Sequence, residues 1–190
     1  SFSLLTTLEC SHCGKQHDPA RPHNICCACQ SPLLARYDLS AARASLDRDE
    51  FSGRPKGMWR WHELLPVYDP ANIVTLGEGD TPLLRLERLG AVTGLTQLYL
   101  KDDSLNPTGT FKARGQAAAI STARELGIQQ VIIPTAGNAG GAMAAYASRA
   151  GMQSRVYMPA DTPKVNIYEC RMTGAEVILV DGLINEAARQ

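Results

Sequence analysis

The 190-residue sequence contains no long apolar run and no excess of charge of either sign. No uninterrupted apolar stretch approaches the roughly 20 residues that a membrane-spanning helix needs. The first residues lack a basic segment followed by a sustained apolar one, so they do not resemble a secretory signal. Nineteen basic side chains balance nineteen acidic ones, which leaves no electrostatic basis for binding nucleic acid or an anionic membrane. We therefore expect a soluble, cytoplasmic protein that binds neither nucleic acid nor membranes.

Apolar residues make up 44% of the sequence, which is enough to bury a core. The character of the chain changes twice along its length. The beginning is rich in turns, cysteine, histidine and proline, and the pattern becomes α/β from about residue 72. We therefore predict three parts: a cysteine-rich segment (1–38), a helical or irregular connection (39–71) and part of an α/β domain (72–190).

Five of the six cysteines lie between residues 10 and 29. In a chain without an export signal, such a cluster indicates a metal site rather than disulfides. Two C-x-x-C pairs are separated by twelve residues, and each pair forms a tight knuckle that aims two thiolates at one point. Residues 1–38 are therefore interpreted as a zinc-ribbon-like segment with a closed, structural Zn²⁺ shell. The predicted ligands are Cys10, Cys13, Cys26 and Cys29.

Other residues of this segment are weaker candidates. Cys27 lies inside the second pair and is expected to point away from the metal. Three histidines could substitute, but four thiolates already complete a tetrahedral shell. The alternatives are a ribbon that has lost its metal and a reduced cysteine cluster without one. Because the charged side chains of residues 1–38 cancel, a docking or stabilising role is favoured over nucleic acid binding.

The connection that follows has a helical pattern over residues 39–51 and then two tryptophans among prolines. A flexible linker is the simplest interpretation of such a segment. Trp59 and Trp61 argue against it, because large aromatic side chains gain much by burial. We expect this segment to dock on the larger α/β domain.

From residue 72, strand and helix patterns alternate. Strands are predicted at 97–103, 130–135, 154–159 and 176–182. Helices are predicted at 111–126 and 138–150, from 162 onward and from 183 onward. Thr162 is expected to cap the third helix, with Pro163 at its first position, and Cys170 is expected to be a buried helix residue. This alternation implies a parallel sheet with right-handed crossovers. The sheet would keep an open edge, so we expect the 190 residues to be a portion of a longer protein and inactive alone.

The stretch NPTGTFKARG (106–115) places one lysine behind small, turn-forming residues at the start of a helix. Thr110 can cap this helix, which puts Lys112 in its first turn. The positive helix end and burial in a cleft would both favour a neutral amine, the form that attacks an aldehyde. A solvent-exposed lysine is the simpler explanation for Lys112 taken alone. Arg114, two positions further, is interpreted as structural.

The stretch PTAGNAGG (134–141) reads as a strand that runs into a glycine-rich helix start. Unpaired amides in the first turn of a helix can bind an anion, and glycines let a ligand approach the backbone. Asn138 adds a side-chain amide that can donate a hydrogen bond. The spacing is not that of a dinucleotide fingerprint. A tight strand–helix connection without a ligand is the alternative.

Three motifs together resemble one family: GEGDTPL (77–83), KDDSLNPTGTFKARG (101–115) and TAGNAGGAMAAYASRAG (135–151). Their order and spacing resemble those of threonine synthases, which are fold type II pyridoxal-phosphate enzymes of the tryptophan synthase β-like family. The resemblance covers about residues 72–190, and a zinc-ribbon-like N-terminal segment is compatible with some members. It implies a lyase that converts O-phosphohomoserine and water to threonine and phosphate with pyridoxal 5′-phosphate. It also implies an amino-acid substrate and a homodimer.

The resemblance assigns roles to individual residues. Lys112 matches the lysine that forms the Schiff base with the cofactor and then acts as general base and acid. Asn138 matches the asparagine that hydrogen-bonds the cofactor 3′-oxygen. The substrate carboxylate would be held by a set of neighbouring residues in the same loop. These are Thr135, Ala136, Gly137, Asn138 and Ala139.

Two departures from the family pattern keep other reactions open. Position 113 is alanine where threonine synthases commonly have aspartate, and position 136 is alanine where a serine often helps to hold the carboxylate. The related alternatives are a threonine or serine dehydratase and a cysteate-synthase-like β-replacement enzyme. An alternative of another class is a non-catalytic zinc-ribbon binding module with an appended α/β domain.

Overall fold

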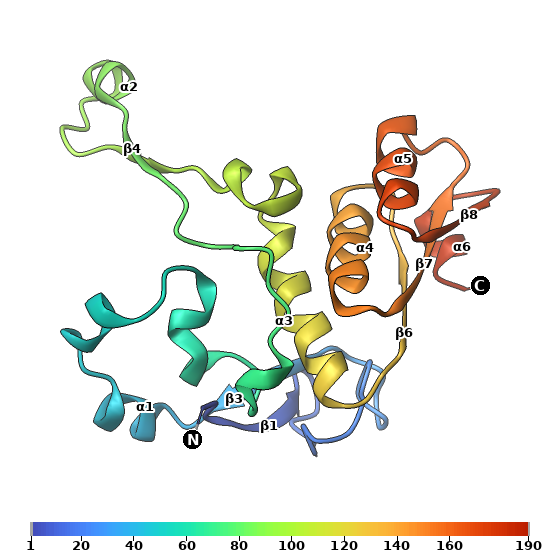
Figure 1. Cartoon of the computed structure of the whole chain (residues 1–190), viewed down its shortest axis with the longest axis horizontal. Coiled ribbons are helices and arrows are strands. Elements are labelled where there is room, and N and C mark those ends of the chain that lie inside the picture. The colour runs from blue at the N-terminus through green and yellow to red at the C-terminus, as the bar shows by residue number, and fades with distance from the viewer. Residues whose placement is uncertain (1, 190) are drawn as a thin grey trace.

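The computed structural model describes residues 2–189 and shows a mixed α/β chain whose cysteine-rich beginning forms a small antiparallel sheet (Figure 1). Strand β1 (Leu5–Cys10) lies between β2 (Gln16–His17) and β3 (Leu33–Tyr37). The sequence pattern had shown little strand periodicity here. The strands have only two to six residues, which is too short for a period-two pattern to stand out.

The connection that follows contains little regular helix. Its elements are α1 (Leu39–Ser45) and three short 3₁₀ segments: η1 (Glu50–Gly53), η2 (Met58–Leu64) and η3 (Pro70–Asn72). The carboxylate of Asp38 caps α1 by accepting a hydrogen bond from a first-turn amide at 2.9 Å. The helix expected over 39–51 is therefore wrong in its length, because α1 already ends at Ser45.

A long arm projects from the body of the chain (Figure 1). It consists of β4 (Leu83–Arg85), α2 (Glu87–Thr93) and β5 (Tyr99–Lys101), and its two strands pair antiparallel. The strand expected at 97–103 is thus present but shorter. It belongs to a separate two-stranded sheet and not to the parallel one, because its partner is a strand that the sequence did not reveal.

The predicted parallel sheet is present in the C-terminal part of the chain. Its strands are β6 (Gln130–Pro134), β7 (Gln153–Pro159) and β8 (Glu176–Val180), in that order and all parallel. The accompanying helices are α3 (Lys112–Glu125), α4 (Asn138–Ala150), α5 (Lys164–Met172) and α6 (Ile184–Ala187). Among residues 2–189, no helix combines the length and the apolar character that crossing a bilayer requires.

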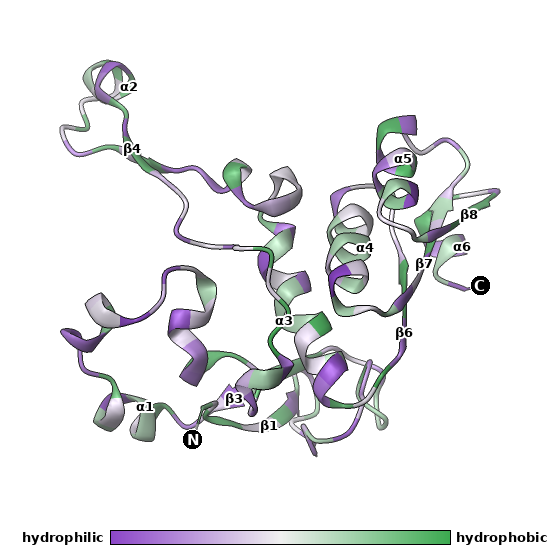
Figure 2. Cartoon of the chain, in the orientation of Figure 1, coloured by the Kyte–Doolittle hydropathy of each residue, from purple (hydrophilic) through white to green (hydrophobic). Residues whose placement is uncertain are grey.

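The core lies where α3 packs on α4 and α4 packs on the sheet. Alanines on both helices are fully buried and let the two helices approach closely. They include Ala113, Ala117, Ala144 and Ala147. On the sheet side, Val156 and Met158 of β7 are also fully buried, and Figure 2 shows hydrophobic residues along β7 and β8. Cys170 is fully buried in α5, as predicted.

The start of α5 differs from the prediction. The helix begins at Lys164, and Pro163 has an extended ψ of 132°, so Pro163 precedes the helix instead of occupying its first position. No side-chain capping bond is formed. The Thr162 hydroxyl is buried without a hydrogen-bond partner among the described residues. The expected cap is therefore wrong, because the extended proline separates Thr162 from the first helical turn.

The connection before the arm is fixed to α3 by a buried serine. The Oγ atom of Ser121, which is 0% exposed, accepts a hydrogen bond from the Val74 amide at 2.8 Å. We predict that Ser121→Ala lowers the free energy of unfolding by about 1–3 kcal/mol, because the buried amide loses its acceptor. Urea denaturation would measure this. The exposed Ser148 of α4 provides a control, since Ser148→Ala should change stability by less than about 0.5 kcal/mol. Equal losses in the two variants would contradict the assignment.

Candidate active site

Lys112 begins α3, and the residues before it set its position. The Oγ1 atom of Thr110 accepts a hydrogen bond from the Lys112 amide at 2.9 Å. The helix begins one residue later than predicted, so Phe111 and not Thr110 occupies the cap position, and Phe111 makes no side-chain capping bond. The Lys112 side chain is exposed, and its Nζ lies 4.6 Å from the centre of the Phe111 ring. The expected burial of this lysine in a cleft is therefore not found in the described chain. The amine is open to an incoming ligand.

The backbone that leads to Lys112 has an unusual conformation. Thr108 and Gly109 both have positive φ values, of 61° and 66°, and for threonine this region is unfavourable. The Thr108 hydroxyl is buried and has no partner among the described residues. Asn106, only 4% exposed, anchors this turn because its Oδ1 accepts from the Gly79 amide at 2.9 Å. The bond from Gly79 to Asn106 thus fixes the turn, and the Thr108 hydroxyl remains without a partner among the described residues.

Arg114 fixes the first turn of α3 to the residues on both sides of the arm, Thr81 before it and Asp103 after it. Its Nε and Nη2 donate to the two carboxylate oxygens of Asp103 at 2.9 and 2.8 Å, in a bidentate pair. The Thr81 hydroxyl donates to the same carboxylate at 2.6 Å. The Arg114 guanidinium, and then the Thr81 hydroxyl, hold the pKa of Asp103 well below its ordinary value of 3.8. The structure therefore gives Arg114 a structural role, and it joins the GEGDTPL and NPTGTFKARG motifs.

The glycine-rich loop joins β6 to α4. The Thr135 hydroxyl, in a residue only 6% exposed, accepts a hydrogen bond from the Gly137 amide at 3.2 Å. A Cβ atom at Gly140 would lie 2.7 Å from the Thr135 methyl group, and one at Gly141 would lie 2.3 Å from the Glu169 carboxyl carbon. Glycine at position 140 therefore lets α4 start this close to β6, whereas a side chain at position 141 would displace the Glu169 carboxyl. Asn138, the first residue of α4, remains exposed.

Helix α5 supports this loop through residues that the sequence did not single out. The Nδ2 atom of Asn166 donates to the Ala136 carbonyl oxygen at 3.3 Å. The half-buried carboxyl of Glu169 lies over Gly141, and its burial raises its pKa. Neither residue belongs to a recognisable sequence motif. Each reaches the loop only because α5 packs beside α4.

Glu78 connects the first motif to α4. Its side chain is fully buried, and its Oε2 accepts from the Tyr146 hydroxyl at 2.6 Å. The same carboxylate accepts from the indole Nε1 of Trp59 at 2.8 Å, from the Thr75 hydroxyl at 3.1 Å and from the Leu76 amide at 3.1 Å. Burial, and then the contact with Glu78, raise the pKa of Tyr146, so this hydroxyl stays protonated. Trp59 docks on the α/β part through this bond.

These contacts bring the predicted lysine and glycine loop to one end of the molecule. The segment Pro107–Gly109 contacts α4, and α3 packs along α4. Both helices run in the direction opposite to β6, so their N-termini lie at the same end (Figure 1). The strand before α3 had been expected in the parallel sheet, but it belongs to the antiparallel arm. The packing of α3 on α4, and not a shared sheet, therefore sets Lys112 and Asn138 at the same end.

The cysteine-rich segment forms a second candidate site. Four sulfur atoms lie within 4.8 Å of one another, and two of their separations are 3.3 and 3.7 Å. A tetrahedral shell with Zn–S bonds of about 2.3 Å places sulfurs about 3.8 Å apart. The donor set therefore fits a metal ion such as Zn²⁺. The cluster consists of Cys10, Cys13, Cys26 and Cys29.

The two halves of this cluster have matching backbone geometry. The Cys10 carbonyl accepts from the Gly14 amide at 3.2 Å, and the Cys26 carbonyl accepts from the Gln30 amide at 2.9 Å. Gly14 and Gln30, each just after the second cysteine of a pair, have positive φ values of 72° and 58°. Each C-x-x-C pair thus forms a closed turn that directs its sulfurs to the same point. Cys27 is exposed and lies outside the cluster.

Residues 74–190 match the family described as Pyridoxal-phosphate dependent enzyme. This match covers more than half of the chain and includes Lys112 and the glycine-rich loop. The chain belongs to this family of pyridoxal-phosphate dependent enzymes.

Individual relatives align over more of the chain than the family match does. The threonine synthase of Methanocaldococcus jannaschii is 35% identical over 180 residues, which cover 94% of this chain and 44% of that protein. The threonine synthase of Methanosarcina acetivorans is 32% identical over 181 residues, which cover 95% of this chain and 44% of that protein. This chain thus spans less than half the length of these relatives. Both alignments extend toward the N-terminus beyond the family match.

A solved structure of a protein with another activity has a similar fold. The processed form of threonine deaminase isoform 2 from Solanum lycopersicum has 30% identity and a TM-score of 0.51. The similarity covers 56% of this chain and 30% of that chain. The fold of this part of the chain is therefore shared with a protein whose activity differs from that of the threonine synthases.

The Asp103–Arg114 pair gives a prediction for acid stability. A carboxyl whose pKa is lowered by folding stabilises the folded state above its unfolded pKa of about 4, and this contribution is lost as the pH falls toward the folded pKa. We predict that Asp103→Asn lowers stability at neutral pH and flattens its decline as the pH falls below about 4. Urea denaturation at a series of pH values would measure this. Asp161→Asn is a suitable control because Asp161 is exposed, and it should keep the native profile. A native profile in Asp103→Asn would contradict the role of the pair.

Proposed function

We propose that the protein containing this chain is a pyridoxal-phosphate-dependent lyase that converts O-phosphohomoserine and water to threonine and phosphate. The observation that carries the proposal is the pairing of an exposed lysine amine with a glycine-rich loop at the N-termini of two packed helices. The similarity to threonine synthases over almost the whole chain supports this substrate over others.

The residues at this end of the molecule fit pyridoxal phosphate. Lys112 offers an exposed amine for the cofactor aldehyde, and Asn138 offers an exposed side-chain amide. The first turns of α3 and α4 carry partial positive charge and unpaired amides, which favour anionic groups. The unpartnered hydroxyl of Thr108 adds a polar group in the turn before Lys112. When bound, the cofactor supplies an electron sink for the substrate Cα.

The chain's own residues then bind and orient the substrate. Lys112 Nζ would accept the proton of the substrate Cα and return it, as a general base and acid. The loop from Thr135 to Ala139 would hold the substrate carboxylate through backbone amides. The Thr135 hydroxyl accepts from the Gly137 amide and donates a long bond of 3.5 Å to the Gly137 carbonyl oxygen; it would exchange that long bond for one to a carboxylate oxygen. Ala136 lacks the hydroxyl that other family members use, so the amides carry more of this contact.

Two further reactions are compatible with the same residues. A threonine or serine dehydratase is supported by the similarity to the tomato threonine deaminase, and a cysteate-synthase-like β-replacement enzyme uses the same lysine chemistry. A panel of O-phosphohomoserine, threonine, serine and O-phosphoserine separates these reactions. Phosphate release from O-phosphohomoserine, with threonine as product, supports the proposal. Ammonia release from threonine or serine as the main activity would replace it.

Binding of the cofactor at Lys112 has a readout that does not require turnover. We predict that adding pyridoxal phosphate and then borohydride attaches the cofactor covalently to the peptide that contains Lys112, as mass spectrometry would show. Lys112→Ala should lose this label. The control Lys164→Ala, at an exposed lysine of α5, should keep it. Metal binding without any label at Lys112 would instead favour a non-catalytic zinc-ribbon module.

The four clustered thiolates are proposed to hold one structural Zn²⁺, since a closed shell leaves no open position for catalysis. We predict one equivalent of zinc in the native protein, as elemental analysis would show. Cys13→Ser should lose the metal and unfold at a lower temperature, because metal binding contributes directly to folding of such modules. Cys27→Ser is the matched control and should retain both zinc and stability. Equal zinc content in all three proteins would refute the assignment.

A further inference from the structure

The peptide unit between Ala136 and Gly137 is held at both of its edges. Its N–H group, that of Gly137, donates to the Thr135 hydroxyl at 3.2 Å. Its carbonyl group, that of Ala136, accepts from Asn166 Nδ2 at 3.3 Å. A Cβ atom at Gly137 would lie 3.8 Å from the same Nδ2, so the Asn166 amide lies along the backbone of both residues. Because a peptide unit is planar, contacts at its two opposite edges fix its orientation.

The orientation of this peptide unit sets the direction of the amides that follow it. The Gly137 carbonyl oxygen accepts from the Gly140 amide at 3.0 Å, which closes the first turn of α4. The amides of Asn138 and Ala139 have no acceptor among the described residues, as is usual for the first positions of a helix. They are free donors, and the proposed function directs them at the substrate carboxylate.

Asn166 is the one side chain from another element that hydrogen-bonds the loop 135–139 in the described part of the chain. One turn further along α5, the Glu169 carboxyl lies over Gly141, so the same face of α5 follows the start of α4. Position 136 is alanine, which supplies no hydroxyl for an anion. The grip of the loop on a carboxylate therefore depends on how well its backbone amides are aimed.

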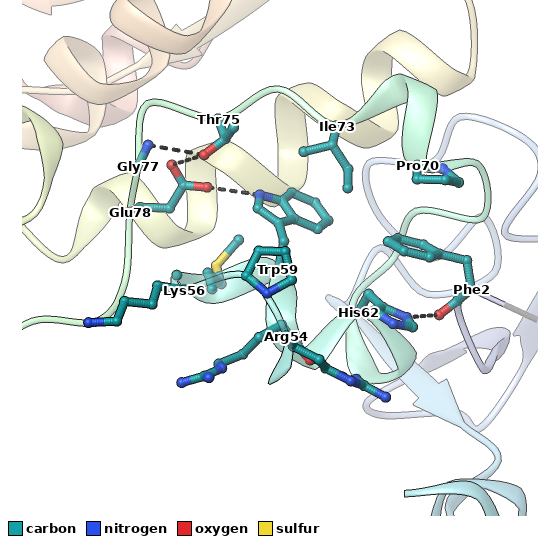
Figure 3. A pocket seen from close by; sticks show the side chains of 14 residues that line it. Phe2, Arg54, Lys56, Trp59, His62, Pro70, Ile73, Thr75, Gly77 and Glu78 are labelled. Atoms are coloured by element: carbon teal, nitrogen blue, oxygen red, sulfur yellow. Dashed lines mark hydrogen bonds between the residues drawn. The ribbon is translucent and has the colours of Figure 1, made fainter. Parts of the chain in front are cut away.

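Helix α4 as a whole is fixed independently of Asn166. Figure 3 shows the Glu78 carboxylate with its bonds to Trp59 and Thr75. The same carboxylate accepts from the Tyr146 hydroxyl of α4 at 2.6 Å. Loss of the contact from α5 should therefore loosen the loop and leave the position of the helix unchanged.

We propose that Asn166 is a positioning residue that sets the affinity of the site for the substrate carboxylate. It acts through the Ala136 carbonyl, which it holds so that the next two amides point toward the ligand. This inference rests on the proposed function, because it takes the loop to be the carboxylate site. It assigns Asn166 no part in proton transfer at the substrate Cα, so binding and turnover should respond differently to its replacement.

Steady-state kinetics of the full-length protein with pyridoxal phosphate test this separation. Asn166→Asp keeps the size of the side chain and replaces the donating amide with an acceptor, whereas Asn166→Ala removes the donor without adding charge. Both should raise KM about tenfold and change kcat by less than about twofold. Asn185→Asp, at an exposed asparagine of α6, is the matched control and should keep the native constants.

Hydrogen exchange followed by mass spectrometry provides a readout without turnover. A peptide that covers residues 135–141 should exchange several-fold faster in both Asn166 variants, because the loop loses its contact with α5. Peptides from α3 should exchange at the native rate. The Asn185→Asp control should match the native protein in both regions.

Native KM values or native loop exchange in both Asn166 variants would overturn the proposal. A loss of kcat at unchanged KM would also overturn it. Native behaviour of Asn166→Asp alone would show that the side chain acts by packing and not by donating a hydrogen bond, which is a third contrary result.

Failure of the proposed function is measured separately. O-Phosphohomoserine, threonine, serine and O-phosphoserine all carry an α-carboxylate, so the KM comparison uses whichever of them the protein converts. Conversion of threonine or serine alone would refute the proposed reaction and leave the test of Asn166 intact. Loop exchange is read without substrate, so it decides the positioning role even in a protein that converts none of them.

Discussion

The buried carboxylate of Glu78 is the interaction on which the arrangement of this chain depends. A carboxylate removed from water is costly unless donors replace the lost hydration. Here two side-chain hydroxyls, an indole and an amide do so. Because Trp59 comes from the connection and Tyr146 from α4, satisfying one charge joins segments that are distant in sequence. The connection is therefore part of the folded structure and not a linker.

Both parts of the candidate site, the turn before Lys112 and the glycine-rich loop, are connected to the segment that contains Glu78. On one side, the neighbouring Gly79 amide binds Asn106, which anchors the turn before the lysine, and Asp103 with Arg114 fixes the first turn of α3. On the other side, Tyr146 belongs to the helix that begins with the glycine-rich loop. The reactive groups are thus exposed while their supports are buried. This division suits a site that must be open to ligand yet hold its geometry.

The cysteine-rich segment is joined to the same framework. Its Leu4 amide donates to the Glu63 carbonyl at 2.8 Å, and the Tyr68 hydroxyl donates to the Leu5 carbonyl at 2.9 Å. A carboxylate of α3, that of Glu125, in turn accepts from the Tyr68 and Asp69 amides. Hydrogen bonds therefore run from the metal-binding segment, through the connection, to the far end of the helix that carries the lysine. Metal binding would stabilise this part of the framework.

The sequence by itself determined what depends on neighbours along the chain. The helices α3 and α4, the three parallel strands and the contact of the Thr110 hydroxyl with the Lys112 amide are set by local periodicity and local hydrogen bonds, as are the two cysteine turns. Only the tertiary structure decided the antiparallel pairing of the arm, the partner of Arg114, the burial of Glu78 and the exposure of Lys112. Each of these depends on groups far apart in sequence, and no pattern within one segment specifies which distant donor will meet a given acceptor.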